Sequence, residues 1–193
     1  MTQEQILQVF RDTGVMLEGH FLLTSGRHSD RYMQCAHLFE HASHSEALCK
    51  MLADAFRDDG VTLVVGPALG GIIMSYEMAR QLGCRNIFAE RENGAMTFRR
   101  GFEIKPGDRV LMVEDTVTTG GSVREVIELL RAQGAELVGV GAIVDRSAGK
   151  VDFGVPFRAV LSMDVVSYEA ADCPLCREGK LALVKPGSRA LKG

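Results

Sequence analysis

Apolar residues recur at helical spacing in two stretches near the N-terminus. Within residues 3–12 they fall on one face of a helix, and Thr2 and Gln5 have the spacing of a capping box. A second helix is predicted between Ser43, as its cap, and Gly60, as its end. Both helices are expected to pack an apolar face against the rest of the molecule.

From residue 61 onward the pattern changes to short runs that are apolar throughout and that alternate with helical segments. The predicted strands are 61–65, 86–89, 109–113, 137–144 and 159–163, with helices up to Gln81 and over 122–133. Wholly apolar strands separated by helices of about 10–15 residues are typical of a parallel sheet covered on both faces. The predicted fold class is therefore α/β, with a central parallel sheet of about five strands flanked by helices.

The two ends of the chain do not follow this rhythm. Residues 21–33 are polar and rich in turn formers, and we interpret them as a strand, a turn and a second strand. We expect the segments 1–40 and 164–193 to form a hood on a core of about residues 41–163. At 193 residues the chain is expected to be one domain, 1–193.

Composition and charge exclude several classes of protein. The chain is 46% hydrophobic and 24% charged, as globular proteins are, and its net charge of -3 argues against nucleic-acid or anionic-membrane binding. Its apolar runs are far shorter than the roughly 18 residues of a membrane helix, and its start lacks the features of a secretory signal. Five scattered cysteines suit a reducing compartment. We therefore expect a cytoplasmic protein.

Candidate chemistry is concentrated where the third predicted strand ends. Glu114 and Asp115 follow an apolar run, and threonines, two glycines and a serine lead from them into a helix. Ligands of a parallel sheet bind at the carboxyl ends of its strands. There, the backbone N–H groups of this glycine-containing turn and the N-terminus of the helix that follows would suit a phosphate. Because two carboxylates would repel a bare phosphate, the ligand should carry hydroxyls or Mg²⁺ beside it, as a ribose phosphate does. The plain alternative is a capped strand-to-helix turn.

The same segment, Val113–Ser122 (VEDTVTTGGS), closely resembles the phosphoribosyl-pyrophosphate (PRPP) binding motif of the type I phosphoribosyltransferases. Residues 23–30, 66–72 and 144–146 are similar to segments of the orotate phosphoribosyltransferases within them. The resemblance covers nearly the whole chain. It implies Mg²⁺-dependent transfer of ribose 5-phosphate from PRPP to orotate, which yields orotidine 5′-monophosphate and pyrophosphate in de novo pyrimidine (UMP) biosynthesis.

The resemblance also assigns residues to roles. It implies catalytic roles for Glu114 and Asp115, and orotate binding by Thr118 and Arg146. The PRPP-binding set would be Glu114, Asp115, Thr116, Val117, Thr118, Thr119, Gly120, Gly121, Ser122 and Arg91, and the pyrophosphate loop would be Ala68, Leu69, Gly70 and Gly71. Mg²⁺ would arrive on PRPP and water, with no direct protein ligand. The enzyme would be a homodimer in which a neighbouring subunit donates a cationic loop.

This chain departs from the family pattern in that loop. Residues 90–101 contain no lysine or histidine, and Thr24 stands where the family places a lysine. Arg91, Arg99 or Arg100 would have to supply the charge, and arginine suits bidentate contact with phosphate. The alternative is that these arginines form the solvated face of a hairpin.

Arg146 has a physical rationale of its own. A guanidinium at a strand end can hold a carboxylate through two charge-assisted hydrogen bonds, and orotate carries a carboxylate. The alternative is a structural ion pair with Asp145 or Asp164. In the N-terminal turn, Arg27 and His28 either cover the base or are simply solvated.

Cys173 and Cys176 form a Cys-x-x-Cys pair near the C-terminus. A zinc site normally needs four ligands, and no second pair with the usual spacing exists, so a structural turn is the favoured interpretation. Zinc shared across a dimer and a reactive dithiol are the alternatives.

Two other functions also stay open: transfer to another nucleobase, and regulation by PRPP binding without catalysis.

Overall fold

The computed structural model describes residues 1–23 and 25–186. Its main sheet has the strand order β5-β4-β3-β6-β7-β8, and all neighbours are parallel except β4 and β5. The strands are β3 (Leu63–Pro67), β4 (Arg85–Glu92), β5 (Ala95–Thr97), β6 (Arg109–Val117), β7 (Glu136–Asp145) and β8 (Phe157–Ser162). The predicted parallel sheet of five strands is confirmed, and β5 is an additional antiparallel strand.

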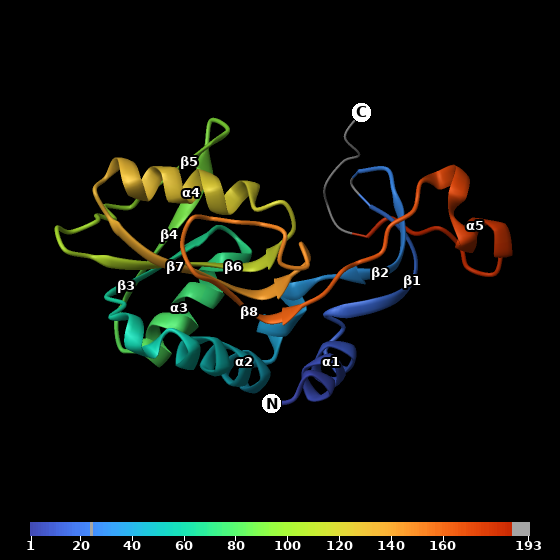
Figure 1. The fold of residues 1–193 in the computed structure, drawn as a ribbon, viewed down its shortest axis with the longest axis horizontal. Coiled ribbons are helices and arrows are strands. Elements are labelled where there is room, and N and C mark those ends of the chain that lie inside the picture. The colour runs from blue at the N-terminus through green and yellow to red at the C-terminus, as the bar shows by residue number, and fades with distance from the viewer. Residues whose placement is uncertain (24, 187–193) are drawn as a thin grey trace.

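Helices cover both faces of this sheet (Figure 1). Helices α2 (Ala42–Ala55) and α3 (Gly70–Leu82) lie on one face, and α4 (Gly121–Ala132) lies on the other. Within β3, Val64 packs into the core on the α2 and α3 side, whereas Leu63 packs with α4 residues. Burial on both faces explains why the strands are apolar throughout.

The helix ends follow the sequence pattern in part. Helix α1 (Gln3–Asp12) has the predicted capping box: Gln5 N donates to Thr2 Oγ1 at 3.3 Å, and Thr2 N donates to Gln5 Oε1 at 2.8 Å. The cap predicted at Ser43 is wrong, because α2 already begins at Ala42 and Ser43 lies in its first turn. A 3-10 helix, η2 (Arg57–Asp59), separates α2 from Gly60.

The N- and C-terminal segments lie together at one end of the molecule (Figure 1). Strands β1 (Met16–Leu22) and β2 (His28–Met33) form a hairpin, and η1 (Cys35–Glu40) leads from it to α2. The strand, turn and strand predicted within 21–33 are present, but the first strand begins five residues earlier, at Met16. The C-terminal segment contains η3 (Ala170–Asp172) and α5 (Pro174–Glu178) and runs beside this hairpin. No helix in the described ranges is long and apolar enough to cross a membrane.

The strand order creates a switch point between β3 and β6. After β3 the chain continues to β4 on one side, and after β5 it crosses back to β6 on the other side of β3. The segments that leave the carboxyl ends of β3 and β6 therefore turn in opposite directions. In open α/β sheets this crevice is where ligands bind.

Candidate functional site

A cavity of about 700 Å³ opens at the carboxyl end of β6. It is lined by Leu23, Ser25, Tyr32, Met33, Gln34, Cys35, Ala36, Glu114, Asp115, Thr116, Val117, Thr118, Thr119, Gly120, Gly121, Ser122, Val123, Glu125, Arg146 and Pro186. All nine residues of the 114–122 motif and Arg146 thus share one cavity. The sequence predicted this grouping from the motif and from the strand end that carries Arg146.

The motif is more regular than a loop. Strand β6 continues through Val117, and Thr116 and Val117 pair with Val144 and Asp145 of β7. The turn itself is short and includes Gly120. Its φ of +75° is a conformation that favours glycine. A Cβ at this position would lie 2.8 Å from the ring of Phe153, so there is no room for a side chain. Helix α4 then begins with its N-terminus at the cavity, where its free N–H groups favour an anion.

The two acids lie where the segments after β3 and β6 meet. The Asp115 N–H donates to Glu114 Oε1 at 3.2 Å. A Cβ built on Gly70 would lie 2.4 Å from Asp115 Oδ2, so the Asp115 carboxylate rests directly against the Gly70 backbone. The acidic end of the motif and the predicted pyrophosphate loop therefore adjoin each other.

Another part of the cavity wall comes from the end of β2 and the residues that follow it, from Tyr32 to Ala36. Thr116 Oγ1 donates to Cys35 Sγ at 3.0 Å. Burial, reinforced by the nearby Asp115 carboxylate, raises the pKa of Cys35 to about 12. This thiol therefore stays protonated and is a poor nucleophile. Sequence reasoning missed this wall, since Tyr32, Gln34 and Cys35 belong to no motif and reach the cavity only through the tertiary fold.

Arg146 is the only basic residue among the described residues that line the cavity. It follows β7, and its N–H donates to Val117 O at 2.8 Å. Its Nε is buried with no hydrogen-bond partner among the described residues, and burial lowers the pKa of the guanidinium. A buried N–H group is normally hydrogen-bonded, and a guanidinium binds anions well. The unpartnered Nε of Arg146 therefore suits an anionic ligand.

The structural ion pairs considered for Arg146 do not form within the described part of the chain. Asp145 instead accepts hydrogen bonds from the backbone and hydroxyl of Ser147 and from Gly149 and Ser162, over 2.6–2.9 Å. Burial by itself raises the pKa of Asp145. These hydrogen bonds lower it by more, so the pKa of Asp145 lies below its usual value. The Asp164 carboxylate instead faces a lysine, with its Oδ2 4.0 Å from Lys150 Nζ.

Of the predicted pyrophosphate loop, Ala68 and Leu69 connect β3 to α3, and Gly70 and Gly71 are the first residues of α3. None of the four lines the cavity. The peptide between Ala68 and Leu69 is cis, and the Leu69 side chain is 84% exposed. The assignment of Ala68, Leu69, Gly70 and Gly71 to pyrophosphate stays a prediction.

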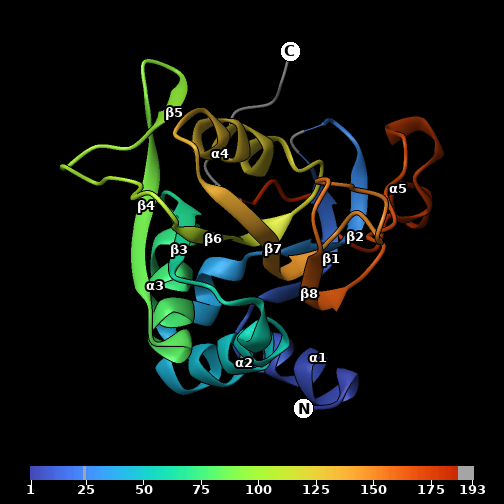
Figure 2. The same ribbon diagram turned by 60° about the vertical axis from the view of Figure 1, so that its left-hand side comes forward.

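The segment 90–101 is more ordered than its polar sequence suggests. Residues up to Thr97 form the β4–β5 hairpin, which projects past α4 (Figure 2). Asn93 and Gly94 at its tip have φ of +50° and +87°. A hairpin, the alternative that the sequence left open for this segment, therefore forms over residues 90–97, with the Asn-Gly pair as its turn.

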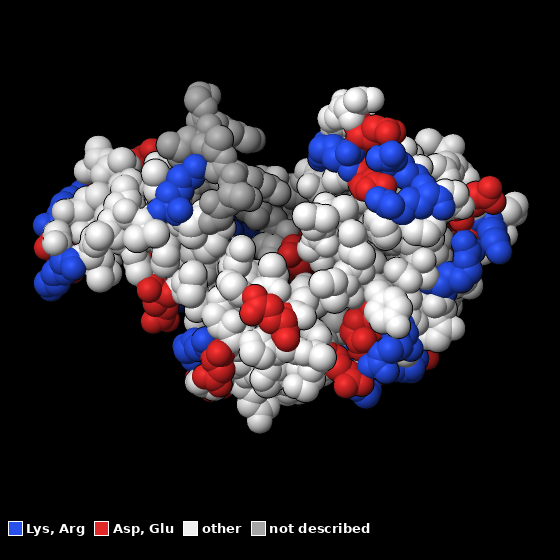
Figure 3. Space-filling model, turned by 180° about the vertical axis from the view of Figure 1, so that it is seen from behind, with Lys and Arg blue, Asp and Glu red and all other residues white. Residues whose placement is uncertain are grey.

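The three arginines of this segment are paired with acids and lie outside the cavity wall. Arg91 contacts Glu125 at 2.9 Å, Arg99 contacts Glu92 at 3.4 Å, and Arg100 contacts Glu90 at 3.1 Å. Figure 3 shows positive and negative side chains intermixed over this hairpin. The assignment of Arg91 to PRPP therefore stays a prediction.

The N-terminal turn differs from both interpretations given to it. Arg27 donates to Ser167 Oγ at 2.9 Å and forms an ion pair with Glu169. His28 is buried rather than solvated, and neither residue lines the cavity. Thr24, at the position of the family's lysine, lies outside the described residues.

Comparison with known proteins agrees with this geometry. Residues 38–166 match the family described as "Phosphoribosyl transferase domain". The orotate phosphoribosyltransferase of Pelotomaculum thermopropionicum is 58% identical over 191 residues, which are 99% of this chain and all of that protein. The orotate phosphoribosyltransferase of Thermotoga maritima is 55% identical over 187 residues, which are 97% of this chain and all of that protein.

Solved structures support the same grouping. The crystal structure of orotate phosphoribosyltransferase from Aeropyrum pernix matches with a TM-score of 0.72 at 26% identity, over 82% of this chain and 93% of that one. The Mycobacterium tuberculosis orotate phosphoribosyltransferase in complex with inorganic phosphate matches with a TM-score of 0.66 at 25% identity, over 82% and 94%. Since the family match spans more than half of the chain and relatives more than 50% identical span nearly all of it, the chain belongs to the orotate phosphoribosyltransferases.

Proposed function

We propose that this protein transfers ribose 5-phosphate from PRPP to orotate, giving orotidine 5′-monophosphate and pyrophosphate in pyrimidine biosynthesis. The observation that carries the proposal is Arg146, whose buried Nε has no partner in the described structure and which shares a cavity with Glu114 and Asp115. A carboxylate-bearing base matches the guanidinium, and a hydroxylated sugar matches the two acids. Thr118, beside them in the cavity wall, supplies a further hydrogen-bonding group for orotate.

The PRPP end of the cavity is built for a sugar phosphate. The N-terminus of α4, with the hydroxyls of Thr119 and Ser122, offers several hydrogen-bond donors to the 5-phosphate. Glu114 and Asp115 accept hydrogen bonds from the ribose hydroxyls, because ionised carboxylates are acceptors only. The ribose ring is thereby oriented with its anomeric carbon toward the base.

The reaction is a displacement at that anomeric carbon. The bond from carbon to the pyrophosphate oxygen breaks, the electron pair leaves with pyrophosphate, and a ring nitrogen of orotate forms the new bond. The proton that this nitrogen carried is released to water or to the departing pyrophosphate. The chain's contribution is positioning and electrostatic stabilisation: the Asp115 and Glu114 carboxylates favour the positive charge that develops on the ribose. No protein nucleophile is needed, in keeping with the raised pKa of the Cys35 thiol in the wall.

The cavity suits Mg²⁺ as the cofactor. Its described lining holds the Glu114 and Asp115 carboxylates with one guanidinium, Arg146, whereas the third lining carboxylate, Glu125, pairs with Arg91. A polyanionic substrate therefore needs a cation with it. Mg²⁺ typically keeps several waters and binds substrate phosphates, and here it would be held by PRPP and water. When bound, it neutralises part of the charge that develops on pyrophosphate.

The β4–β5 hairpin and α3 support a homodimer. Leu69, Ile73 and Tyr76 are exposed at helical spacing around the start of α3 and form an apolar stripe, which suits an interface between copies. The hairpin arginines, which lie outside their own chain's cavity wall, would reach the pyrophosphate of a partner. None of the five cysteines, all of which are described, forms a disulfide, in keeping with a cytoplasmic enzyme.

Replacing Ile73 by Asp should dissociate this dimer. A carboxylate at the centre of an apolar interface would be buried without a partner, at a cost of several kcal/mol. Light scattering coupled to gel filtration would then give the mass of one 21.0 kDa chain, where the wild type gives twice that mass. A variant that keeps the wild-type mass would place the interface elsewhere.

The activity is tested by following orotate absorbance after PRPP and Mg²⁺ are added to the purified protein. Loss of orotate with stoichiometric release of pyrophosphate is expected, and uracil, adenine and guanine should not be consumed in its place. Consumption of another base with orotate untouched would refute the proposed substrate. Binding of PRPP without turnover of any base would instead indicate a regulator.

Replacing Arg146 by Ala should weaken the use of orotate. Loss of the charged contacts to its carboxylate is expected to cost about 2–4 kcal/mol, or roughly 30- to 1000-fold in kcat/KM for orotate. The KM for PRPP should stay near that of the wild type, and Arg146→Lys should recover only part of the loss, since an ammonium lacks the planar fork. Unchanged kinetics for orotate would show that Arg146 is structural.

A further inference from the structure

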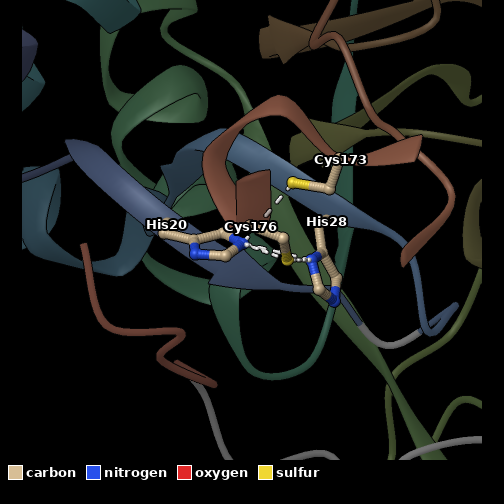
Figure 4. Close-up of side chains that lie close together, drawn as sticks. All are labelled: His20, His28, Cys173 and Cys176. Carbon is tan, nitrogen blue, oxygen red and sulfur yellow. Dashed lines mark hydrogen bonds between the residues drawn. The ribbon is translucent and has the colours of Figure 1, made fainter. Parts of the chain in front are cut away.

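Two histidines and two cysteines converge inside the N- and C-terminal segments, outside the cavity wall (Figure 4). His20 comes from β1 and His28 from β2, while Cys173 immediately precedes α5 and Cys176 lies within it. One ring nitrogen of each histidine and both sulfurs lie within 4.8 Å of one another. We call these four residues the His–Cys cluster.

The fold brings the His–Cys cluster together from distant parts of the sequence. In the hairpin, Leu22 pairs with His28, and the register is irregular between Glu18 and Phe21, the stretch that carries His20. The His20 ring reaches His28 from this irregular stretch, with Nε2 of His20 3.1 Å from Nδ1 of His28. The C-terminal segment bonds to both sides of the hairpin, through Tyr168 to His28 and through Val184 to His20 and Leu22. Between these two attachments the segment carries the cysteine pair across the histidines.

Four of the six distances between ligand atoms of the His–Cys cluster are close to those of a tetrahedral metal site, and the other two are within 4.8 Å. At ordinary zinc bond lengths, tetrahedral ligands lie about 3.3 Å apart for two nitrogens and about 3.6 Å apart for nitrogen and sulfur. In this structure, His20 Nε2 lies 3.1 Å from His28 Nδ1 and 3.5 Å from Cys173 Sγ. Cys176 Sγ lies 3.6 Å from His20 Nε2 and 3.2 Å from His28 Nδ1.

Hydrogen bonds among the four side chains do not account for this convergence. His20 Nδ1 lies 3.2 Å from the Leu181 carbonyl oxygen, which can only accept, so Nδ1 carries the proton and Nε2 has a single lone pair. Three groups crowd around that lone pair, from His28, Cys173 and Cys176, and it can accept one hydrogen from them. A cation at the centre satisfies all four groups, and the Leu181 carbonyl is then the outer partner that metal-binding histidines normally have.

We propose that the His–Cys cluster binds one Zn²⁺ ion in a structural site. Two sulfurs and two imidazole nitrogens are the ligands that zinc prefers over magnesium or calcium, and four protein ligands leave no open position for catalysis. On binding, each thiol releases its proton and coordinates as a thiolate. His20, His28 and Cys173 are 4%, 5% and 0% exposed, whereas Cys176 is exposed, so three ligands come from the interior and the fourth closes the site on the solvent side.

This site would fasten the C-terminal segment over the hairpin. The turn and the end of that hairpin supply Leu23, Ser25, Tyr32 and Met33 to the cavity wall. Zinc would thus hold part of the active-site wall without touching substrate. The inference concerns metal content and stability, and it holds whichever base the enzyme uses.

The direct test is metal analysis of the full-length protein purified without chelators. Mass spectrometry of the metals should find about one zinc per chain. Cys176→Ser and His20→Ala should lose that zinc, whereas Cys84→Ser and His44→Ala, which alter a cysteine and a histidine outside the His–Cys cluster, should keep it. Chelation of the wild-type protein should lower its Tm by about 10 °C or more, and added zinc should restore it.

A second measurement covers variants that fail to fold. Co²⁺ added to the chelated, reduced wild-type protein should give the visible absorption of tetrahedral cobalt with thiolate ligands, at one equivalent per chain. Absence of zinc in the purified protein together with no uptake of Co²⁺ or Zn²⁺ by the reduced protein would overturn the proposal. Zinc that persists in both Cys176→Ser and His20→Ala would overturn it as well.

Discussion

Asp115→Asn is expected to lower kcat/KM for PRPP by about 10²–10³-fold. The substitution keeps the size of the side chain but removes the negative charge that accepts hydrogen bonds from the ribose and stabilises its developing positive charge. Each charged hydrogen bond contributes about 1.5–3 kcal/mol, and Asn loses one such bond while its remaining oxygen accepts a weaker, neutral one. A total loss of about 3–4 kcal/mol corresponds to this factor. Because the Asp115 carboxylate rests against Gly70, it cannot move aside to let another group replace it.

The measurement is initial velocity with both substrates varied, together with the Tm of each variant. Glu128→Gln is the matched control, since Glu128 is a carboxylate on α4 that pairs with Arg131 and does not line the cavity. It should retain wild-type kinetics, and both variants should unfold near the wild-type temperature. Near-normal turnover by Asp115→Asn would remove the role assigned to this acid.

Gly66→Ala is expected to lower the free energy of unfolding by about 3 kcal/mol or more. A Cβ at this position would lie 2.2 Å from the Gly71 carbonyl oxygen and 2.8 Å from its carbon, so the backbones of β3 and α3 would have to separate. Overpacking that moves backbone is among the costlier single substitutions. For a chain of this size the expected fall in Tm is about 6–12 °C.

Gly121→Ala is the matched control for this prediction. A Cβ there meets nothing closer than 3.8 Å, and Gly121 is the first residue of α4, where alanine favours the helix. Urea unfolding should therefore show Gly121→Ala at least as stable as the wild type. Equal stability of Gly66→Ala would mean that β3 and α3 can part at little cost.

The parallel sheet and the cavity could be predicted because local pattern and topology agree. Wholly apolar runs gave five strands, and the motif at the end of β6 fell where a parallel sheet binds ligands. The end of the strand was predicted too early, at residue 113. Residues 114–116 are polar, but pairing with β7 keeps the chain in β6 through Val117. Strand pairing, which is a tertiary interaction, outweighed local polarity there.

The His–Cys cluster shows what sequence spacing cannot supply. Cys173 and Cys176 were visible as a pair, but their expected partners were sought at the short spacing of a single motif. His20 and His28 are eight residues apart and become neighbours only because the hairpin folds back at their register. To find such a pair, one must know which residue of one strand lies opposite which residue of the other. The polar turn between residues 22 and 28 does not fix that register in the sequence.

The attachment of the C-terminal segment to the β1–β2 hairpin bears on the solubility of the protein. A two-stranded hairpin has two open edges, and unpaired edges invite strand addition by other chains. Here Tyr168 occupies one edge and Val184 the other, so the same segment shields both. A chain shortened before residue 164 would expose both edges at once, and we expect its first defect to be aggregation rather than slow turnover.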